Sequence, residues 1–226
     1  MLFILLKEII MKSDAVLQHD VMAELKWEPS VNAAHIGVEV KNGIVTLTGY
    51  VDSYSEKWAA EQAALRVYGV KALTVELEVN LPGFSKRNDL DIAISAENVL
   101  RWSTDIPEGV VKIVVENGWI TLTGELEWQY QQRTALTALR HIVGVKGISN
   151  KMSIKPVLSS SPNKVEVEAA LKRTSKNETH NIHVNVQGSD VTLTGTVHSW
   201  FDRDLARYCA WNTPGVHKVI DNIEVI

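Results

Sequence analysis

Aromatic and basic side chains gather three times in this sequence, each time between a predicted strand and the helix predicted to follow it. Tryptophan and tyrosine suit an interface between water and lipid, and the first turn of a helix favours an anion. Basic side chains nearby would add attraction to anionic headgroups. The pattern therefore predicts either a surface that binds anionic phospholipid or a partner protein, or aromatic packing between neighbouring domains. The candidate residues are Tyr54, Trp58, Trp128, Tyr130, Arg133, Trp200, Phe201 and Arg203.

A pair of histidines is the second group that could do chemistry. His180 and His183 lie close together before a predicted hairpin, where imidazole nitrogens could bind a metal ion. No carboxylate or cysteine completes a ligand set at a suitable spacing, and the other repeats lack the pair. We therefore expect a solvated strand edge there, and no cofactor.

Signatures of catalysis and of nucleic-acid binding are missing or incomplete. The sequence has no phosphate-binding glycine loop and no Gly-x-Ser-x-Gly, and its single cysteine, Cys209, stands where the other repeats have a small core residue. Residues 144–147 match the Gly-x-x-Gly clamp of KH domains, but they join a helix to a strand and not two helices. The formal net charge of −4 also disfavours a polyanion as ligand. We expect no enzyme and no nucleic-acid partner.

A repeated stretch organises the elements that position these residues. It reads Asn-Gly, then an alternating segment with Thr-x-Thr, then a closing glycine, and it occurs at 42–49, 117–124 and, with a changed turn, at 188–195. A Gly-Val pair follows each closing glycine at the same distance. Asn-Gly between alternating apolar residues predicts a tight β-hairpin, whereas 187–190 in the third copy predicts a longer turn.

Each repeat has helical patterns on both sides of this hairpin. Leu17, Val21 and Leu25 recur every four residues, which predicts an amphipathic helix before the hairpin. Ala60, Ala63 and Ala64 predict a second helix that packs closely on a sheet, and an alternating strand ends the unit. A strand-helix-strand crossover makes the last strand parallel to the hairpin's second strand. The expected fold class is α+β: three tandem α-β-β-α-β domains, each a three-stranded mixed sheet with two helices on one face.

The repeats also set the expected boundaries. Residues 1–11 form a leader or a mis-called start, 12–81 domain 1, 82–88 a linker, 89–155 domain 2, 156–162 a linker and 163–226 domain 3. No apolar run is long enough to span a bilayer, and residues 1–11 lack the features of a secretory signal. The expected location is the cytoplasm, with the periplasm as the alternative if the N-terminus is misannotated.

The repeated motif resembles that of a known family. The order α-β-β-α-β, the pattern V-x-N-G-x-V-x-L-x-G-x-V from Val40 to Val51 and the later Gly-Val pair are similar to those of BON domains, also called transport-associated domains, of osmotically induced and secretin-associated bacterial proteins. The resemblance covers nearly all of residues 12–226. It implies binding of phospholipid, an envelope surface or partner proteins without catalysis, in osmotic or envelope stress. The alternatives are a stress holdase and a protein that binds a small ligand or a metal.

Overall fold

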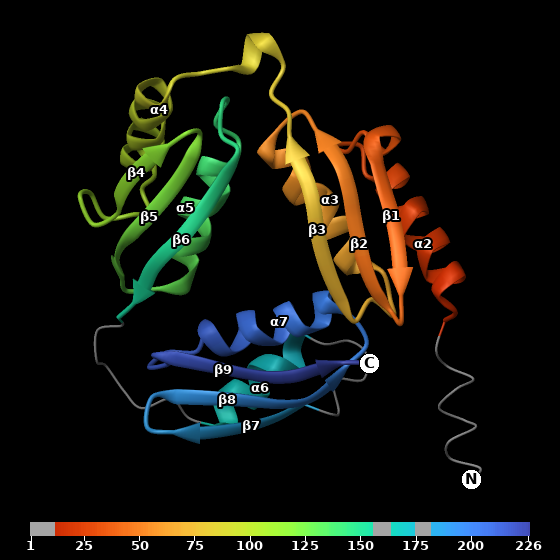
Figure 1. The fold of residues 1–226 in the computed structure, drawn as a ribbon. Helices are drawn as coiled ribbons and strands as arrows, with labels where there is room; N and C mark the ends of the chain where they lie inside the picture. The colour runs from red at the N-terminus through yellow and green to blue at the C-terminus, as the bar shows by residue number, and fades with distance from the viewer. Residues whose placement is uncertain (1–11, 156–163, 175–181) are drawn as a thin grey trace.

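The computed structural model describes residues 12–155, 164–174 and 182–226, and these residues form three similar domains (Figure 1). Domain 1 consists of α2 (Asp14–Trp27), β1 (Ile36–Lys41), β2 (Ile44–Val51), α3 (Tyr54–Arg66) and β3 (Ala72–Val79), with a short 3-10 helix, η1 (Ala33–His35). After η2 (Gly83–Ser85), domain 2 consists of α4 (Asp89–Trp102), β4 (Lys112–Glu116), β5 (Trp119–Leu126), α5 (Gln129–Arg140) and β6 (Gly147–Ile154). Domain 3 consists of α6 (Lys164–Thr174), β7 (Ile182–Gln187), β8 (Asp190–Val197), α7 (Trp200–Trp211) and β9 (Lys218–Val225).

Each domain contains one three-stranded sheet in which the second strand is central. β1 pairs antiparallel with β2, and β3 pairs parallel with β2; domains 2 and 3 repeat both pairings. Side chains alternate along the central strand, so that Val45 and Leu47 are buried under the helices while Thr46 and Thr48 lie on the open face. This arrangement confirms the predicted α+β class and the α-β-β-α-β order.

The hairpin turns follow the Asn-Gly signature in two domains. Asn42 and Asn117 adopt φ of 54° and 53°, and the glycines after them adopt φ of 79° and 82°. Both turn residues thus lie in the left-handed region that a tight two-residue hairpin requires. The expectation of a longer third turn is wrong, because Gln187 pairs directly with Asp190. Gly188 takes the first turn position with φ of 61°, and two residues are therefore enough.

An aspartate at the start of the first helix holds this turn in domains 1 and 2. The Asp14 carboxylate accepts hydrogen bonds from the backbone N–H groups of Asn42 (2.8 Å) and Gly43 (3.0 Å). Asp89 accepts the same two bonds from Asn117 (2.7 Å) and Gly118 (2.8 Å). A single carboxylate thus joins the first helix to the hairpin, and its charge also suits the helix N-terminus.

Asp14→Ala is expected to destabilise domain 1 by about 2 kcal/mol, since two charge-assisted hydrogen bonds are lost. Urea unfolding measures the change, with hydrogen exchange of the β1–β2 turn locating it in domain 1. Asp105→Ala, which removes an exposed carboxylate outside the helices, is the matched control. Equal stability of the two variants would contradict the role of Asp14.

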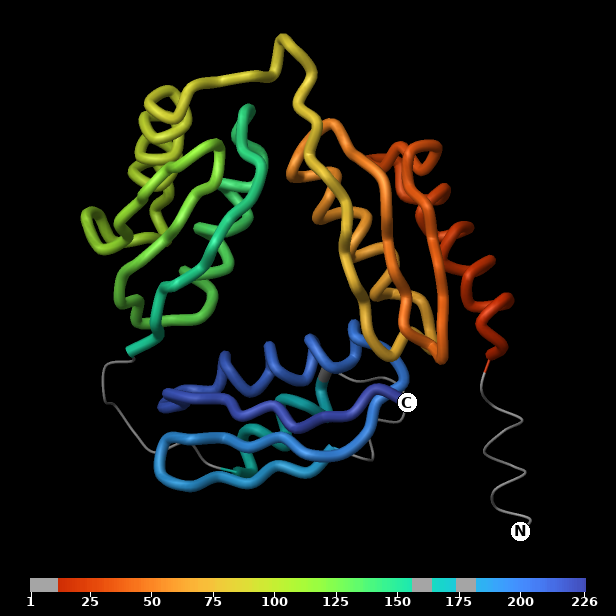
Figure 2. The backbone as a smooth tube through the Cα atoms, viewed as in Figure 1, coloured from red at the N-terminus to blue at the C-terminus, as the bar shows by residue number. Residues whose placement is uncertain are grey.

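Three separate cores result, one in each domain. Small side chains let the second helix lie close to its sheet: Ala60, Ala63 and Ala64 are fully buried in α3, and Cys209 takes such a position in α7. The second helices α3, α5 and α7 turn toward the middle of the molecule, whereas α2 lies on its outside (Figures 1 and 2). No helix in the described ranges has the length and apolar character needed to cross a membrane.

Candidate binding site at the domain junction

The three second helices carry most of the aromatic and basic residues singled out in the sequence, and they meet where the domains meet. The contacts between domains 1 and 3, 1 and 2, and 2 and 3 are called the 1–3, 1–2 and 2–3 seams below. Each seam contains an aromatic ring from one of these helices. Domain packing therefore uses part of the predicted binding set.

The 1–3 seam is formed around Trp200, the first residue of α7. Its indole N–H donates a hydrogen bond to the carbonyl oxygen of Val70 (3.0 Å), and its ring packs against the core of domain 1. Beside it, the rings of Tyr68 and His198 lie 5.6 Å apart between centroids. A hydrogen-bonded, half-buried tryptophan thus attaches domain 3 to the segment between α3 and β3 of domain 1.

The 1–2 seam places a cation over an aromatic face. The guanidinium carbon of Arg140, the last residue of α5, lies 3.4 Å from the centroid of the Trp58 ring. Such a contact contributes on the order of 1 kcal/mol or more when it is shielded from water. Tyr54, at the start of α3, packs against the core of domain 2. Two of the predicted binding residues therefore hold domains 1 and 2 together.

Glu61 is a carboxylate on α3, close to the 1–2 seam. Burial raises the pKa of Glu61 above its ordinary 4.5, while the cations of Lys57 and Arg140 act in the opposite direction. Burial also raises the pKa of Tyr54 and lowers that of Arg140. A raised carboxyl pKa means that the packed state binds the Glu61 proton more tightly, so packing is favoured below about pH 4.5 and weakens as the pH rises through the raised value.

Glu61→Gln is expected to make the protein more stable than wild type at neutral pH, with the difference shrinking as the pH falls toward 4.5. The physical reason is that glutamine removes the buried charge at all pH values. Calorimetric melting temperatures across this range measure the effect. Glu97→Gln removes an exposed carboxylate on α4 and serves as control; parallel pH profiles for the wild type and Glu61→Gln would contradict the assignment.

The 2–3 seam is made by Arg133 of α5, whose guanidinium carbon lies 4.7 Å from the centroid of the Tyr208 ring of α7. Arg133 forms no ion pair with any residue in the described ranges. It is exposed. Of the two basic residues in the predicted set, it is the one whose charge is left available.

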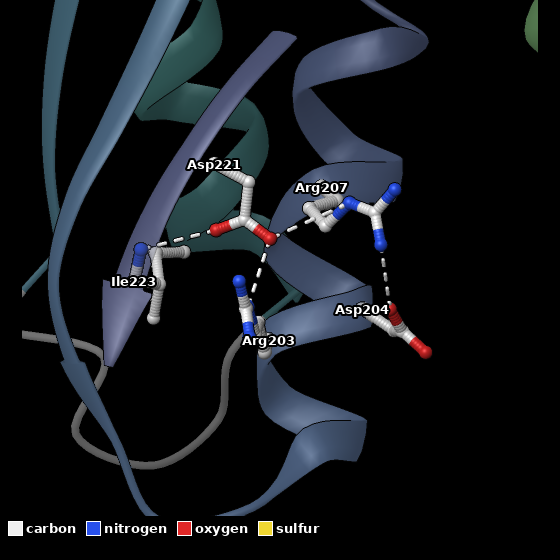
Figure 3. Close-up of polar contacts among 5 residues, drawn as sticks. All are labelled: Arg203, Asp204, Arg207, Asp221 and Ile223. Carbon is white, nitrogen blue, oxygen red and sulfur yellow. Dashed lines mark hydrogen bonds and ion pairs between the residues drawn. The ribbon is translucent and has the colours of Figure 1, made fainter. Parts of the chain in front are cut away.

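Arg203, the other basic residue, is neutralised inside domain 3 (Figure 3). Its Nε lies 2.8 Å from an oxygen of Asp221 on β9, and Arg207 approaches the same oxygen at 3.5 Å. Lys57 and Gln132 take the equivalent position in the other domains, where they donate to the carbonyl oxygens of Leu77 and Met152. The position connects the second helix to the third strand, which gives Arg203 a structural role within the fold.

Three of the predicted aromatic residues are exposed: Trp128 by 38%, Tyr130 by 44% and Phe201 by 61%. Trp128 occupies the N-cap position of α5, where domains 1 and 3 have the capping serines Ser53 and Ser199. Tryptophan cannot accept the capping hydrogen bond, and the Gln131 side chain instead accepts bonds from nearby backbone N–H groups. An exposed tryptophan in a capping position is not explained by helix stability.

The most exposed tryptophans are ones that the sequence-based set left out. Trp27 and Trp102 end α2 and α4 at equivalent positions, with 79% and 75% of their surface exposed. Helical phase could have identified them, because Trp27 follows the buried Leu25 by two residues and so lies about 200° away around the helix. A basic residue precedes each: Lys26 and Arg101.

The histidine pair is only partly described. His183 is exposed on β7, opposite Thr194, and His180 lies outside the described residues. The described ranges contain no cluster of three or more histidine, cysteine or acidic residues that could hold a metal ion.

A hollow of about 570 Å³ lies between α3, α5 and α7. Trp58, Leu65, Trp200 and Phe201 are among its apolar walls, and Arg133 is among its charged ones. The arrangement joins apolar surface, a cation and solvent access at one place, which suits binding.

Comparison with known proteins identifies the repeating unit. The family model described as "BON domain" matches residues 13–80, 88–156 and 161–226. The chain is 27% identical over 146 residues to Osmotically-inducible protein Y of Escherichia coli (strain K12), a match that covers 63% of this chain and 73% of that protein.

Two solved structures from the CdsD protein of the Chlamydia trachomatis type III secretion system also match. One is 14% identical and covers 92% of this chain and 91% of that chain; the other, its C-terminal domain, is 16% identical and covers 96% and 100%. Both superpose with a TM-score of 0.25, and neither bears on how the three domains are arranged here.

The three family matches cover nearly the whole chain, and each falls on one α-β-β-α-β unit with its own sheet and core. This chain therefore belongs to the BON domain family, of which it contains three tandem copies.

Proposed function

We propose that this chain is a non-enzymatic binding protein that attaches to anionic phospholipid surfaces in osmotic or envelope stress. Its family and the name of its osmotically inducible relative support the stress role. The cytoplasmic location expected from the sequence belongs to the same proposal. The observation that carries the lipid assignment is the repeated exposure of Trp27 and Trp102 beside basic residues.

An exposed tryptophan next to a cation fits the boundary between headgroups and acyl chains. The indole ring enters the interface, while Lys26 or Arg101 attracts the negative headgroup. On α4 the exposed apolar residues Leu90 (68%) and Ile94 (50%) lie within about a third of the helix circumference from Trp102. The outer face of α4 therefore forms an amphipathic surface that neither its own core nor the seams require.

The six aromatic candidates divide into two groups in this proposal. Tyr54, Trp58 and Trp200 hold the seams, and their loss would act through the assembly of the domains. Trp128, Tyr130 and Phe201 are exposed and can contribute directly to a surface. We propose lipid contact for these three side chains as well as for Trp27 and Trp102.

Vesicle co-flotation tests the function, with vesicles of phosphatidylglycerol and phosphatidylcholine compared with phosphatidylcholine alone. We expect binding to the anionic vesicles, a decrease with added salt, and a loss of about tenfold in affinity for the Trp27→Ala/Trp102→Ala double variant. Val114→Ala removes an exposed apolar side chain from the open sheet face of domain 2 and is expected to bind like wild type. Absence of vesicle binding would reject the lipid assignment in favour of a protein partner.

A further inference from the structure

The hollow between α3, α5 and α7 has the dimensions of a small-molecule site. Its volume of about 570 Å³ lies within the range of roughly 300–1,000 Å³ that is usual for such sites. All three domains contribute to it, so it exists only when the seams are formed. Exposed Phe201 and Tyr208 line it, so it is accessible from solvent.

The three arginines that line the hollow differ in whether a carboxylate of the protein pairs with them. Arg66 pairs with Glu24 (3.1 Å) and Glu28 (2.8 Å). Arg207 pairs with Asp204 (3.3 Å) and Asp221 (3.5 Å). Arg133 has no carboxylate partner in the described part of the chain. The hollow thus has one cation that is not neutralised by the protein.

Two side chains that can form hydrogen bonds share the hollow with this cation. Gln62 on α3 and Gln129 on α5 line it, and neither side chain forms a hydrogen bond with another residue in the described ranges. Trp58, Trp200 and Phe201 supply aromatic surface on the walls. One cation and two amides against aromatic walls match a ligand with an anionic head and a compact apolar body.

We propose that the domain junction binds one small organic anion of this class, with its carboxylate, sulfonate or phosphate head on Arg133 and its apolar body between the α3 and α7 aromatics. The residues that line the hollow all belong to α3, α5 and α7, and none of them lies on α2 or α4. The site is therefore distinct from the surface proposed on α2 and α4.

The probe for this site is 8-anilinonaphthalene-1-sulfonate, which has one anionic head on a compact aromatic body. Its matched partner, N-phenyl-1-naphthylamine, has the same rings without the sulfonate. Titration of the full chain, followed by probe fluorescence, is expected to show one site for each probe. Arg133→Gln is expected to weaken sulfonate binding by about tenfold or more and to weaken binding of the neutral probe much less, by the part that depends on the contact between Arg133 and Tyr208.

Further variants separate charge from packing. Arg133→Lys keeps the positive charge and should retain most of the sulfonate affinity. Arg173→Gln removes an exposed arginine of α6 away from the hollow and should change nothing. Asp204→Asn removes the carboxylate that lines the hollow and should strengthen sulfonate binding by several-fold.

Equal sulfonate affinity for Arg133→Gln and the wild type would overturn the proposal. So would a parallel loss of both probes in Arg133→Gln, because the arginine would then act only through packing. Vesicle flotation tests the surface on α2 and α4, and probe titration tests this site. Either proposal can therefore fail without the other.

Discussion

Gly49→Ala is expected to destabilise domain 1 by about 3 kcal/mol or more. Gly49 closes the repeated stretch and has φ of 114°, where an alanine is strained. A Cβ at this position would also overlap the backbone carbonyl of His35. That carbonyl belongs to the entry into β1 and cannot move without breaking the β1–β2 register at Ile36.

Hydrogen-exchange mass spectrometry of the full chain measures this effect, because it reports each domain separately. The β1, β2 and β3 peptides should lose protection, while those of domains 2 and 3 change little. Gly83→Ala in the η2 linker is the control, since its Cβ would meet no atom within 4 Å and it has no left-handed φ. Gly124→Ala is the equivalent substitution in domain 2, since its Cβ would overlap the Val110 carbonyl. It should cause the same loss of protection in the strands of domain 2 and leave domain 1 unchanged.

Trp200→Ala is expected to open the 1–3 seam at a cost of about 3 kcal/mol in coupling between the two domains. The substitution removes both the hydrogen bond to Val70 and the ring that packs on the core of domain 1. Domain 3 keeps its own core, so the separate domains should stay folded. Small-angle X-ray scattering should show a larger radius of gyration, and calorimetry should resolve domain 3 as a separate transition.

Phe201→Ala is the matched control for this prediction. Phe201 is the next residue of α7, but 61% of its surface is exposed and it forms no hydrogen bond across the seam. Its variant should keep the wild-type radius of gyration. Indistinguishable scattering from Trp200→Ala and Phe201→Ala would show that the indole does not hold the seam.

Local patterns predicted each domain well because its elements depend on neighbours in sequence. The spacing of Leu17, Val21 and Leu25 identified the buried stripe of α2, and Asn-Gly identified two hairpins. The third turn was mispredicted because Gly-Ser lacks the usual asparagine, although glycine alone supplies the left-handed residue. The bonds from Asp14 and Asp89 to the hairpins span 28 or 29 residues, and no local pattern shows them.

The candidate site was less predictable, since it depends on contacts between domains. The sequence indicated aromatics at the start of each second helix, with a surface or a seam as alternatives. The structure assigns Tyr54, Trp58 and Trp200 to seams, and leaves Trp128, Tyr130 and Phe201 exposed. Arg203 looked available in sequence, but Asp221, on a strand 18 residues later, pairs with it.

The sequence by itself determined the family, the fold of each domain and the place of its turns, because hydrophobic period, turn residues and glycines act over short distances. Only the tertiary structure decided which aromatics are exposed and which cation is unpaired. Those properties depend on side chains that come from different domains, as Arg140 over Trp58 and Arg133 over Tyr208 illustrate. The hollow beside Arg133 exists because three domains meet, and no single repeat encodes it.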